Sequence, residues 1–411
     1  MSISFLMLIF LGTPNLFSAE INYPGYIPIG RDNLSLFYWL FKSRAQLSNA
    51  PLVIFLPGGP GCDIMKHVFM GNGPYDLSLN GTLTSNPLSW NNFADVLFMD
   101  EPVCTGFSIC NDISQSPLDD DGLSADMLAF LTGLYHQFPE YVGRSIYLTG
   151  HSYGGHSVPS VGEAIMNLGD PKFVLSGMAI GNGWFNGVVQ SMAYPEYSYQ
   201  RKLINNFQKI TGLLSYYVYS FFGTRGVFST ANTYKSIGDS IMVGVKHDKF
   251  CIYNYLEDYT CGGDSKYETA LIAFFKRDDV RASLPVIGSN PYSLCNYAVY
   301  PHMIKTVVLG DSSKKLEKLM NNGVKTILYA GALDYICNYD TILAMLRSLD
   351  GWNNLDNLNS ANSTEYYIND QIKGKMTSLT NFTLILVNGA GHMVTDDDRL
   401  ASFDILQRLI N

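Results

Sequence analysis

The sequence predicts an α/β fold in which a mostly parallel central sheet is flanked by helices and carries an inserted cap subdomain. Short, continuous apolar runs end in glycine-rich loops, as buried parallel strands do. Helical apolar spacing fills several intervals between these runs. With 411 residues, 47% of them hydrophobic, the chain is long enough for one large core together with an insertion.

Taken in order, seven runs are expected to form strands. They are Leu34–Phe41, Pro51–Leu56, Ala94–Met99, Arg144–Thr149, Val174–Ile180, Lys325–Ala330 and Phe382–Val387. Two segments, Leu123–Phe138 and Ala401–Ile410, carry apolar residues at helical spacing. Strands that alternate with helices imply a parallel sheet covered on both faces.

The alternation of strand-like and helical segments stops between residues 186 and 292, where aromatic residues are dense and strand-like runs are absent. We therefore assign residues 20–185 and 293–411 to the core and residues 186–292 to the cap insertion.

Residues 1–19 resemble a signal peptide. The apolar stretch Ile3–Leu11 is followed by the small residues Ser18 and Ala19, which predicts cleavage near Ala19. The alternative is an N-terminal strand or buried tail, because no Lys or Arg precedes the apolar stretch and Phe17 stands where a small residue is usual. No later segment is long and apolar enough for a membrane helix. We expect a protein of the secretory pathway, destined for a vacuole, a lysosome or the exterior.

Composition also limits the partners. The net charge is -9, only 15% of residues are charged, and no Lys/Arg run occurs, which disfavours nucleic-acid binding. The chain has no H-E-x-x-H motif, paired C-x-x-C motif or dinucleotide fingerprint, so we expect neither a metal nor an organic cofactor. The sequence leaves the oligomeric state open.

Cysteines and sequons agree with an oxidising compartment. Seven cysteines allow three disulfides and one free thiol. Cys251–Cys261 and Cys104–Cys110 are candidate local loops, although sequence alone does not fix the connectivity. Four sequons are candidate glycosylation sites: Asn33, Asn80, Asn362 and Asn381.

The main catalytic signal is the G-x-S-x-G pattern of Gly150–Gly154, which follows a strand-like run. This pattern suits a serine on a sharp strand-to-helix turn, where Ser152 would be an exposed nucleophile. The alternative is an ordinary glycine-rich turn.

A nucleophilic serine needs a base, and the base needs an acid that orients it. Asp334 follows the Lys325–Ala330 run, and His392 follows the Phe382–Val387 run. Both would lie in loops at the same sheet edge as Ser152, in the chain order Ser, Asp, His. A lone histidine is more often simply packed or solvated, but the setting of His392 favours catalysis.

An oxyanion hole needs two N–H donors. Tyr153 follows the nucleophile directly, and Gly59 lies in the loop after the Pro51–Leu56 strand, so these two are the candidates. A plain Gly/Pro turn is the alternative for the second loop.

Together these residues resemble the serine carboxypeptidase family of α/β-hydrolases. The resemblance runs from about Leu36 to Trp184 and from about Asp278 to the C-terminus, and does not cover the cap. The matching segments are FYWLF, PLVIFLPGGPGC, GNGPY, NPLSWNNFADVLFMDEPVCTGFS, GHSYGGHSVP, GMAIGNGWF, AGALDYICNY and NGAGHMV.

The resemblance implies an α/β-hydrolase fold with Ser152, Asp334 and His392 as the triad. It further implies that Gly59 and Tyr153 supply the oxyanion hole. A disulfide between Cys62 and Cys295, joining core to cap, and a free buried thiol at Cys337 are implied as well.

Three departures from the family pattern concern substrate binding. The family's NGGPGC, ENGP and GESYAG are replaced here around Pro57, Gly71 and His151. The replaced Asn and two Glu would hold a substrate carboxylate. Gly58, Asn72 and His151 remain the candidate substrate-binding residues. A protonated His151 would pair with a carboxylate at acid pH; the alternative is a spacer without a substrate role.

Three functions follow. The first is a serine hydrolase that removes C-terminal residues from peptides through an acyl-enzyme. The second is an esterase or acyltransferase on the same triad, because the carboxylate-binding residues are replaced. The third is a non-catalytic binding protein, which the retained triad disfavours. The expected partner is a peptide or ester substrate.

Overall fold

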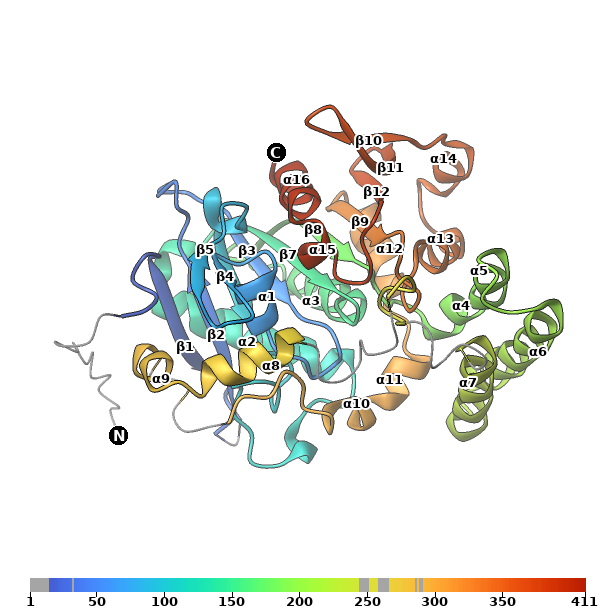
Figure 1. The fold of residues 1–411 in the computed structure, drawn as a ribbon, viewed down its shortest axis with the longest axis horizontal. Helices are drawn as coiled ribbons and strands as arrows, with labels where there is room; N and C mark the ends of the chain where they lie inside the picture. Colours follow the sequence, from blue (N-terminus) through green and yellow to red (C-terminus); the bar gives the residue numbers. More distant parts are fainter. Residues whose placement is uncertain (1–14, 32, 244–250, 258–265, 285–286, 288–290) are drawn as a thin grey trace.

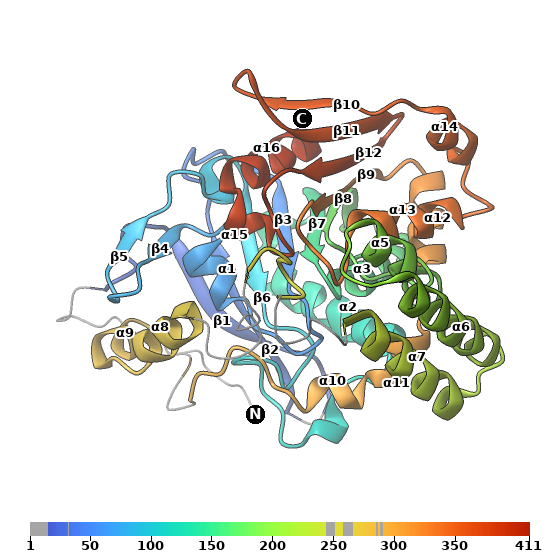
Figure 2. The same ribbon diagram turned by 45° about the vertical axis from the view of Figure 1, so that its right-hand side comes forward.

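The computed structural model describes residues 15–31, 33–243, 251–257, 266–284, 287 and 291–411. Its main feature is a ten-stranded mixed sheet, seen in Figure 1 and Figure 2. In spatial order the strands are β1 (Asn22–Pro28), β2 (Ser35–Phe41), β6 (Asp95–Met99), β3 (Leu52–Leu56), β7 (Ser145–His151), β8 (Val174–Gly181), β9 (Lys325–Gly331), β12 (Phe382–Val387), β11 (Gln371–Leu379) and β10 (Thr364–Ile368).

The centre of this sheet is parallel and its margins are antiparallel. The strands from β6 through β3, β7, β8 and β9 to β12 pair in parallel, while β1 and β2 at one end and β11 and β10 at the other pair antiparallel. The mostly parallel α/β sheet expected from the sequence is therefore confirmed.

The strand register brings several loops to one edge. Leu56 pairs with Gly150, and Gly331 pairs with Val387, so the carboxyl ends of β3, β7, β9 and β12 are level across the sheet. The side chains that follow these four strands consequently meet at this edge.

Helices cover both faces of the sheet. Successive side chains of a strand point to opposite faces, so apolar residues project from each face and pack against helices. In β3, Leu52, Ile54 and Leu56 join one apolar cluster, whereas Val53 and Phe55 join the other. The helices of the first cluster are α2 (Asp120–Gln137), α3 (Gly154–Leu168), α12 (Ser313–Asn321) and α13 (Tyr339–Arg347). Those of the second are α1 (Met65–Met70), α8 (Lys266–Phe275), α15 (Val394–Asp397) and α16 (Arg399–Ile410).

The segment expected to form the cap is mostly helical in its described part, and its helices divide into two groups (Figure 1). The helices α4 (Gly187–Ser191), α5 (Tyr194–Gln200), α6 (Asn206–Gly223) and α7 (Phe228–Val243) lie on one side, with a separate apolar cluster around α5 to α7. Helix α8, followed by α9 (Asp278–Ser283), instead packs with α1.

The remaining elements are short: β4 (Tyr75–Leu77), β5 (Leu83–Ser85), α10 (Val299–His302), α11 (Ile304–Leu309), α14 (Leu355–Ser360) and the 3₁₀ turns Trp90–Asn92, Ile113–Gln115 and Pro139–Tyr141. Within the described ranges, no helix has the length and apolar character needed to cross a bilayer.

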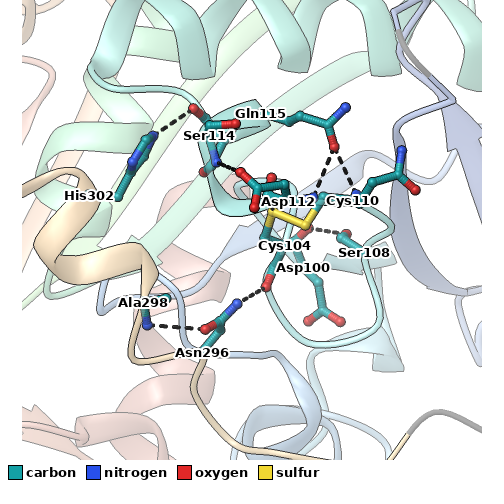
Figure 3. The surroundings of a disulfide bond; sticks show 12 residues. Asp100, Cys104, Ser108, Cys110, Asp112, Ser114, Gln115, Asn296, Ala298 and His302 are labelled. Carbon is teal, nitrogen blue, oxygen red and sulfur yellow. Dashed lines mark hydrogen bonds between the residues drawn. A yellow bond between two sulfur atoms is a disulfide. The ribbon is translucent and has the colours of Figure 1, made fainter.

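Two disulfides are formed as expected, Cys62–Cys295 and Cys104–Cys110. The second closes the loop after β6, which Figure 3 shows beside Asn296, whose side-chain amide donates to the Cys104 carbonyl at 2.8 Å. The expected Cys251–Cys261 pair lies partly outside the described residues, because Cys261 is not described; Cys251 itself is disulfide-bonded.

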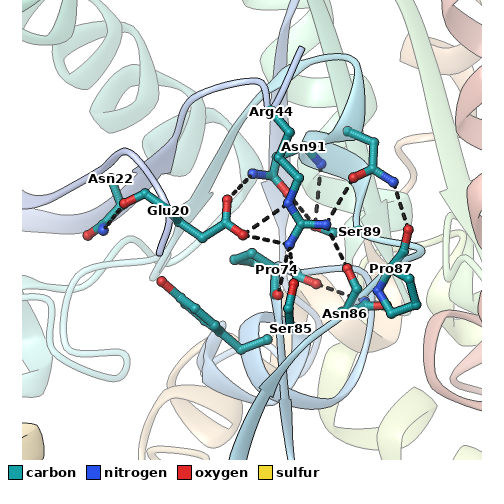
Figure 4. Close-up of polar contacts among 12 residues, drawn as sticks. Glu20, Asn22, Arg44, Pro74, Ser85, Asn86, Pro87, Ser89 and Asn91 are labelled. Carbon is teal, nitrogen blue, oxygen red and sulfur yellow. Dashed lines mark hydrogen bonds and ion pairs between the residues drawn. The ribbon is translucent and has the colours of Figure 1, made fainter. Parts of the chain in front are cut away.

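The segment just before β1 is fixed by a polar network (Figure 4). Glu20 accepts from Arg44 Nε at 2.9 Å and from the Asn91 side chain at 2.9 Å. Arg44 also donates to the carbonyl of Asn86 at 2.7 Å. Glu20 thus ties the chain ahead of the sheet to the loop before β6.

Phe17 lies within the core rather than ahead of it. Its ring is fully buried and meets Trp39 edge-on with ring centroids 5.0 Å apart. The burial of Phe17 argues against the cleavage near Ala19 expected from the sequence. We predict that the purified protein retains Phe17 and that Phe17→Ala lowers the free energy of unfolding by about 3–5 kcal/mol. N-terminal sequencing of the purified protein and urea unfolding check these points; a chain that starts at Glu20 would contradict the first.

Candidate active site

The nucleophile candidate lies on a strained turn between β7 and α3. Ser152 has φ of 56°, a left-handed conformation that costs a non-glycine residue energy and is typical of functional sites. Its amide donates to the carbonyl of Gly181 at 3.0 Å, and its carbonyl accepts from Trp184 at 2.8 Å. Gly155 is required here, because a Cβ would come within 2.4 Å of the Trp184 backbone.

Asp334 and His392 are brought together from the loops after β9 and β12. His392 Nδ1 lies 2.9 Å from Asp334 Oδ2, and both side chains are buried. The carboxylate also accepts from the amides of Ile336 at 3.0 Å and Cys337 at 3.1 Å. These bonds hold the carboxylate as an acceptor that orients the imidazole.

Asn182, to which sequence reasoning assigned no role, completes this set. Its side-chain amide donates to Asp334 Oδ2 at 2.6 Å, and its own amide donates to the Tyr329 carbonyl at 2.7 Å. The residue is fully buried at the end of β8. Asn182 is therefore a positioning residue for the acid.

Ser152 and His392 line one pocket of about 610 Å³. Among the described residues, no hydrogen bond joins the Ser152 hydroxyl to His392; such bonds are often long without substrate. The insertion reaches the pocket through Tyr253, whose ring centroid is 5.1 Å from that of His392 and whose carbonyl accepts from the His392 amide at 2.7 Å. Tyr253 was not among the predicted residues.

One oxyanion candidate, Tyr153, follows Ser152 in the chain, and the other, Gly59, lines the same pocket as Ser152. Among the described residues, neither the Gly59 nor the Tyr153 backbone N–H donates to another protein group. Gly59 has φ of 113°, where L side chains are strained. Gly58 also has to remain small, since a Cβ there would lie 2.8 Å from the Ser152 Cβ.

Asp120 anchors the side chain of Tyr153. Its hydroxyl donates to Asp120 Oδ1 at 2.8 Å, and His156 Nδ1 contacts Asp120 Oδ2 at 2.7 Å. The contacts with His156 and Tyr153 lower the pKa of Asp120 despite its burial. A charged Asp120 thus fixes the residue that carries one candidate oxyanion donor.

A pair of histidines lines the same pocket as Ser152. The rings of His67 and His151 have centroids 4.7 Å apart, and His151 lies 5.9 Å from His392 by the same measure. Burial lowers the pKa of His67 to about 4. Burial, with His67, His392 and Lys66 as neighbours, also lowers the pKa of His151 well below its usual value. These surroundings disfavour a protonated His151, which was one of the two alternatives left open by the sequence.

The Asp396 side chain occupies the space that a side chain at position 71 would need. A Cβ on Gly71 would come within 2.8 Å of Asp396 Oδ1. Asp396 Oδ2 is 3.2 Å from Lys66 Nζ, and both residues line the pocket. Asn72 is buried away from the pocket lining, and among the described residues its side-chain amide has no partner.

A metal site was not expected from the sequence. Within the described ranges, no group of three or more His, Cys, Asp or Glu side chains has the arrangement needed to hold a metal ion. Cys337 is a buried free thiol next to Asp334, and burial raises its pKa.

Two buried carboxyl groups, Asp100 and Glu101, are expected to contribute more to stability at acid pH. Burial raises the pKa of Asp100 to about 7 and that of Glu101 to about 8, so both bind protons more tightly folded than unfolded. Their stabilising contribution is complete below their unfolded pKa values of about 4 and is lost as pH rises toward 8, by about 1.4 kcal/mol per pH unit for each group.

Urea unfolding between pH 5 and pH 8 measures this slope. Glu101→Gln keeps an acceptor for the Ser157 hydroxyl, which donates to Glu101 at 2.9 Å, but cannot titrate. We expect this variant to lose stability less steeply than the wild type as pH rises. Equal slopes would contradict the assignment.

Comparisons with known proteins agree with this geometry. The model of the serine carboxypeptidase family matches residues 14–411. Serine carboxypeptidase-like 47 of Arabidopsis thaliana is 30% identical over 398 residues, covering 94% of this chain and 77% of that protein. Carboxypeptidase Y homolog A of Botryotinia fuckeliana is 29% identical, covering 95% of this chain and 72% of that protein.

Among solved structures, a prohormone-processing carboxypeptidase of Saccharomyces cerevisiae superposes with a TM-score of 0.81. Its identity is 24%, with 95% of this chain and 91% of that chain covered, and the likeness shows a shared fold. The family match spans the chain from just before Phe17 to its last residue. The chain therefore belongs to the serine carboxypeptidase family and is a serine-type, carboxypeptidase-like hydrolase of the α/β-hydrolase fold.

Proposed function

We propose that this protein removes C-terminal residues from peptides through an acyl-enzyme formed on Ser152. The observation that carries the proposal is the buried contact of His392 with Asp334, in the pocket that Ser152 also lines. A hydroxyl nucleophile, an imidazole base and an orienting carboxylate are the parts that acyl transfer needs.

In the proposed reaction, Ser152 Oγ attacks the scissile carbonyl while His392 Nε2 takes its proton. The Gly59 and Tyr153 N–H groups donate to the developing oxyanion. His392 then gives the proton to the leaving amine, and the C–N bond breaks. Water then attacks the acyl-enzyme ester while His392 takes its proton. His392 gives this proton to Ser152 Oγ as the C–O bond breaks, which releases the acid.

The residues of the insertion that line the pocket support its role as a cap that sets substrate preference. Tyr253, Asn254 and Glu257 line the pocket from residues 251–257. The amide of Tyr255 donates to the Leu333 carbonyl at 3.0 Å, which ties this segment to the loop that carries Asp334. We propose residues 186–292 as the cap.

Lys66 is our candidate for the group that recognises a substrate's terminal carboxylate. His67 and His151 are neutral donors at most, given their lowered pKa values. Lys66 Nζ adds a cation beside them, although Asp396 partly offsets its charge. The weaker alternative is an esterase or acyltransferase, which the replacement of the family's carboxylate-binding residues at Pro57, Gly71 and His151 favours.

Kinetics on three matched substrates test the proposal: a blocked dipeptide, its C-terminal amide and a simple ester, each between pH 4 and pH 7. We expect hydrolysis of the ester and faster cleavage of the free acid than of the amide. Lys66→Met should remove the preference for the acid while ester hydrolysis continues. If the free-acid peptide is cleaved no faster than its amide at any pH, the carboxypeptidase proposal is wrong and the esterase alternative takes its place.

We also propose a location in the secretory pathway. Two disulfides and a fifth disulfide-bonded cysteine, Cys251, support an oxidising compartment. The four sequon asparagines Asn33, Asn80, Asn362 and Asn381 are exposed, so each is accessible to a glycan.

A further inference from the structure

Helix α6 carries a row of large apolar side chains on its outer face. Phe207 is 75% exposed, Ile210 51%, Leu214 60%, Tyr217 57% and Phe221 53%. In both ribbon views α6 lies at the outer margin of the molecule, beyond α4 and α5 (Figure 1, Figure 2). We call these five residues the α6 stripe.

The stripe is not needed to hold α6 on the protein, because the opposite face of the helix already does so. Gly212, Ser215, Tyr216 and Tyr219 are buried there. Tyr216 donates to Asp239 of α7 at 2.8 Å, and the Ser215 hydroxyl donates to the Tyr234 carbonyl at 2.7 Å. A helix that is apolar on both faces is normally covered on both.

The spacing of the stripe indicates what covers it. Successive members are separated by three, four, three and four residues, which is the a/d repeat of helices that pack along their length. The row extends over about 21 Å of helix. Because it is straight and regular, the same row on a second copy of the chain is a complementary surface, as an isologous interface requires.

The area is sufficient for association. Phe and Tyr side chains bury about 150–250 Å² each, so five members that expose half or more of their surface offer on the order of 500 Å² per chain. Two copies together bury about 1,000 Å² from the stripe alone, near the lower limit of specific interfaces.

The charges of α6 disfavour a lipid surface. Interfacial membrane helices carry rows of Lys and Arg on their polar face. Here Lys209 is the one charged residue in α6, it pairs with Glu196, and the face opposite the stripe packs on protein. The net charge of -9 also opposes binding to anionic lipids.

We propose that two copies of this chain form a dimer in which the α6 stripes pack against each other, antiparallel about a two-fold axis near Leu214. This surface is separate from the catalytic pocket, so dimer formation and hydrolysis are tested independently.

Sedimentation equilibrium of the full chain tests the proposal at about 1–100 µM. The wild type should be dimeric, and Leu214→Glu should weaken the dimer by about 30-fold or more, since the change buries a charge at the interface centre. Leu118→Glu is the matched control, because Leu118 is 62% exposed but lies outside the stripe, and it should remain dimeric. Circular dichroism and ester hydrolysis confirm that both variants fold.

Cysteine cross-linking locates the interface. Under mild oxidation Leu214→Cys should give a covalent dimer, whereas Leu118→Cys should not. A wild type that is monomeric throughout the concentration range, or a dimer that Leu214→Glu leaves intact, would overturn the proposal. Binding of a monomeric wild type to phosphatidylcholine vesicles would overturn it in favour of a membrane surface.

Discussion

Ser152→Ala is expected to lower kcat/KM by about 10⁶-fold, and His392→Ala by a similar factor. Without the hydroxyl no acyl-enzyme forms, and without the imidazole no group removes its proton. The two residues act as one unit, so the double variant should be scarcely slower than either single variant. Initial rates on the ester substrate measure all three.

Ser160→Ala is a matched control for this result. Ser160 lies on α3, eight residues beyond Ser152, and is buried; among the described residues its hydroxyl has no partner. Its loss should leave kcat/KM within about threefold of wild type, as for changes outside the functional contacts. A Ser152→Ala variant that retains a tenth of the wild-type activity would refute the assignment of the nucleophile.

Asp334→Asn should have the next largest effect, about 10⁴-fold on kcat/KM. The side chain keeps its shape but gains an N–H₂ group in a place where Asn182, Cys337 and His392 all present donors. Whichever way the new amide turns, it either loses a bond to the backbone or favours the wrong tautomer of His392. Steady-state kinetics measure the loss, and circular dichroism at the same pH checks the fold.

Asn182→Ala separates positioning from chemistry. It removes one donor from Asp334 without changing the acid, so a loss of about 10–100-fold in kcat with KM nearly unchanged is expected. An Asp334→Asn variant less affected than Asn182→Ala would mean that the carboxylate is not the group that orients His392.

The central strands were predictable because each is buried on both faces and so is apolar throughout. Leu52–Leu56 and Phe382–Val387 were expected almost to the residue. The marginal strands β1, β10 and β11 were missed, since each has an exposed face and a mixed sequence. The hairpin between β10 and β11 turns at Asn369 and Asp370, both left-handed.

The site was predictable where a catalytic residue type follows a strand-like run in a known chain order. Asp334 and His392 were found in this way, after Ser152 in the order Ser, Asp, His. Asn182 also follows such a run, but its contact with Asp334 depends on β8 lying beside β9, and the sequence did not indicate which strands are neighbours. Tyr253 reaches His392 from a segment 139 residues away in sequence, a contact made only by the tertiary fold.

Local sequence left the charge of His151 open, because this histidine next to the nucleophile could be either a cation for a carboxylate or a spacer. The fold places His67 of α1 and Phe55 of β3 against its ring. Burial, and after it the neighbouring His67, lowers the pKa of His151.

Fluorophosphonate labelling followed by peptide mass spectrometry tests directly whether the three loops assemble an activated serine. The wild type should carry one adduct, on the peptide that contains Ser152, and His392→Ala should label far more slowly. A folded wild type that remains unlabelled, or one labelled at another serine, would contradict the account.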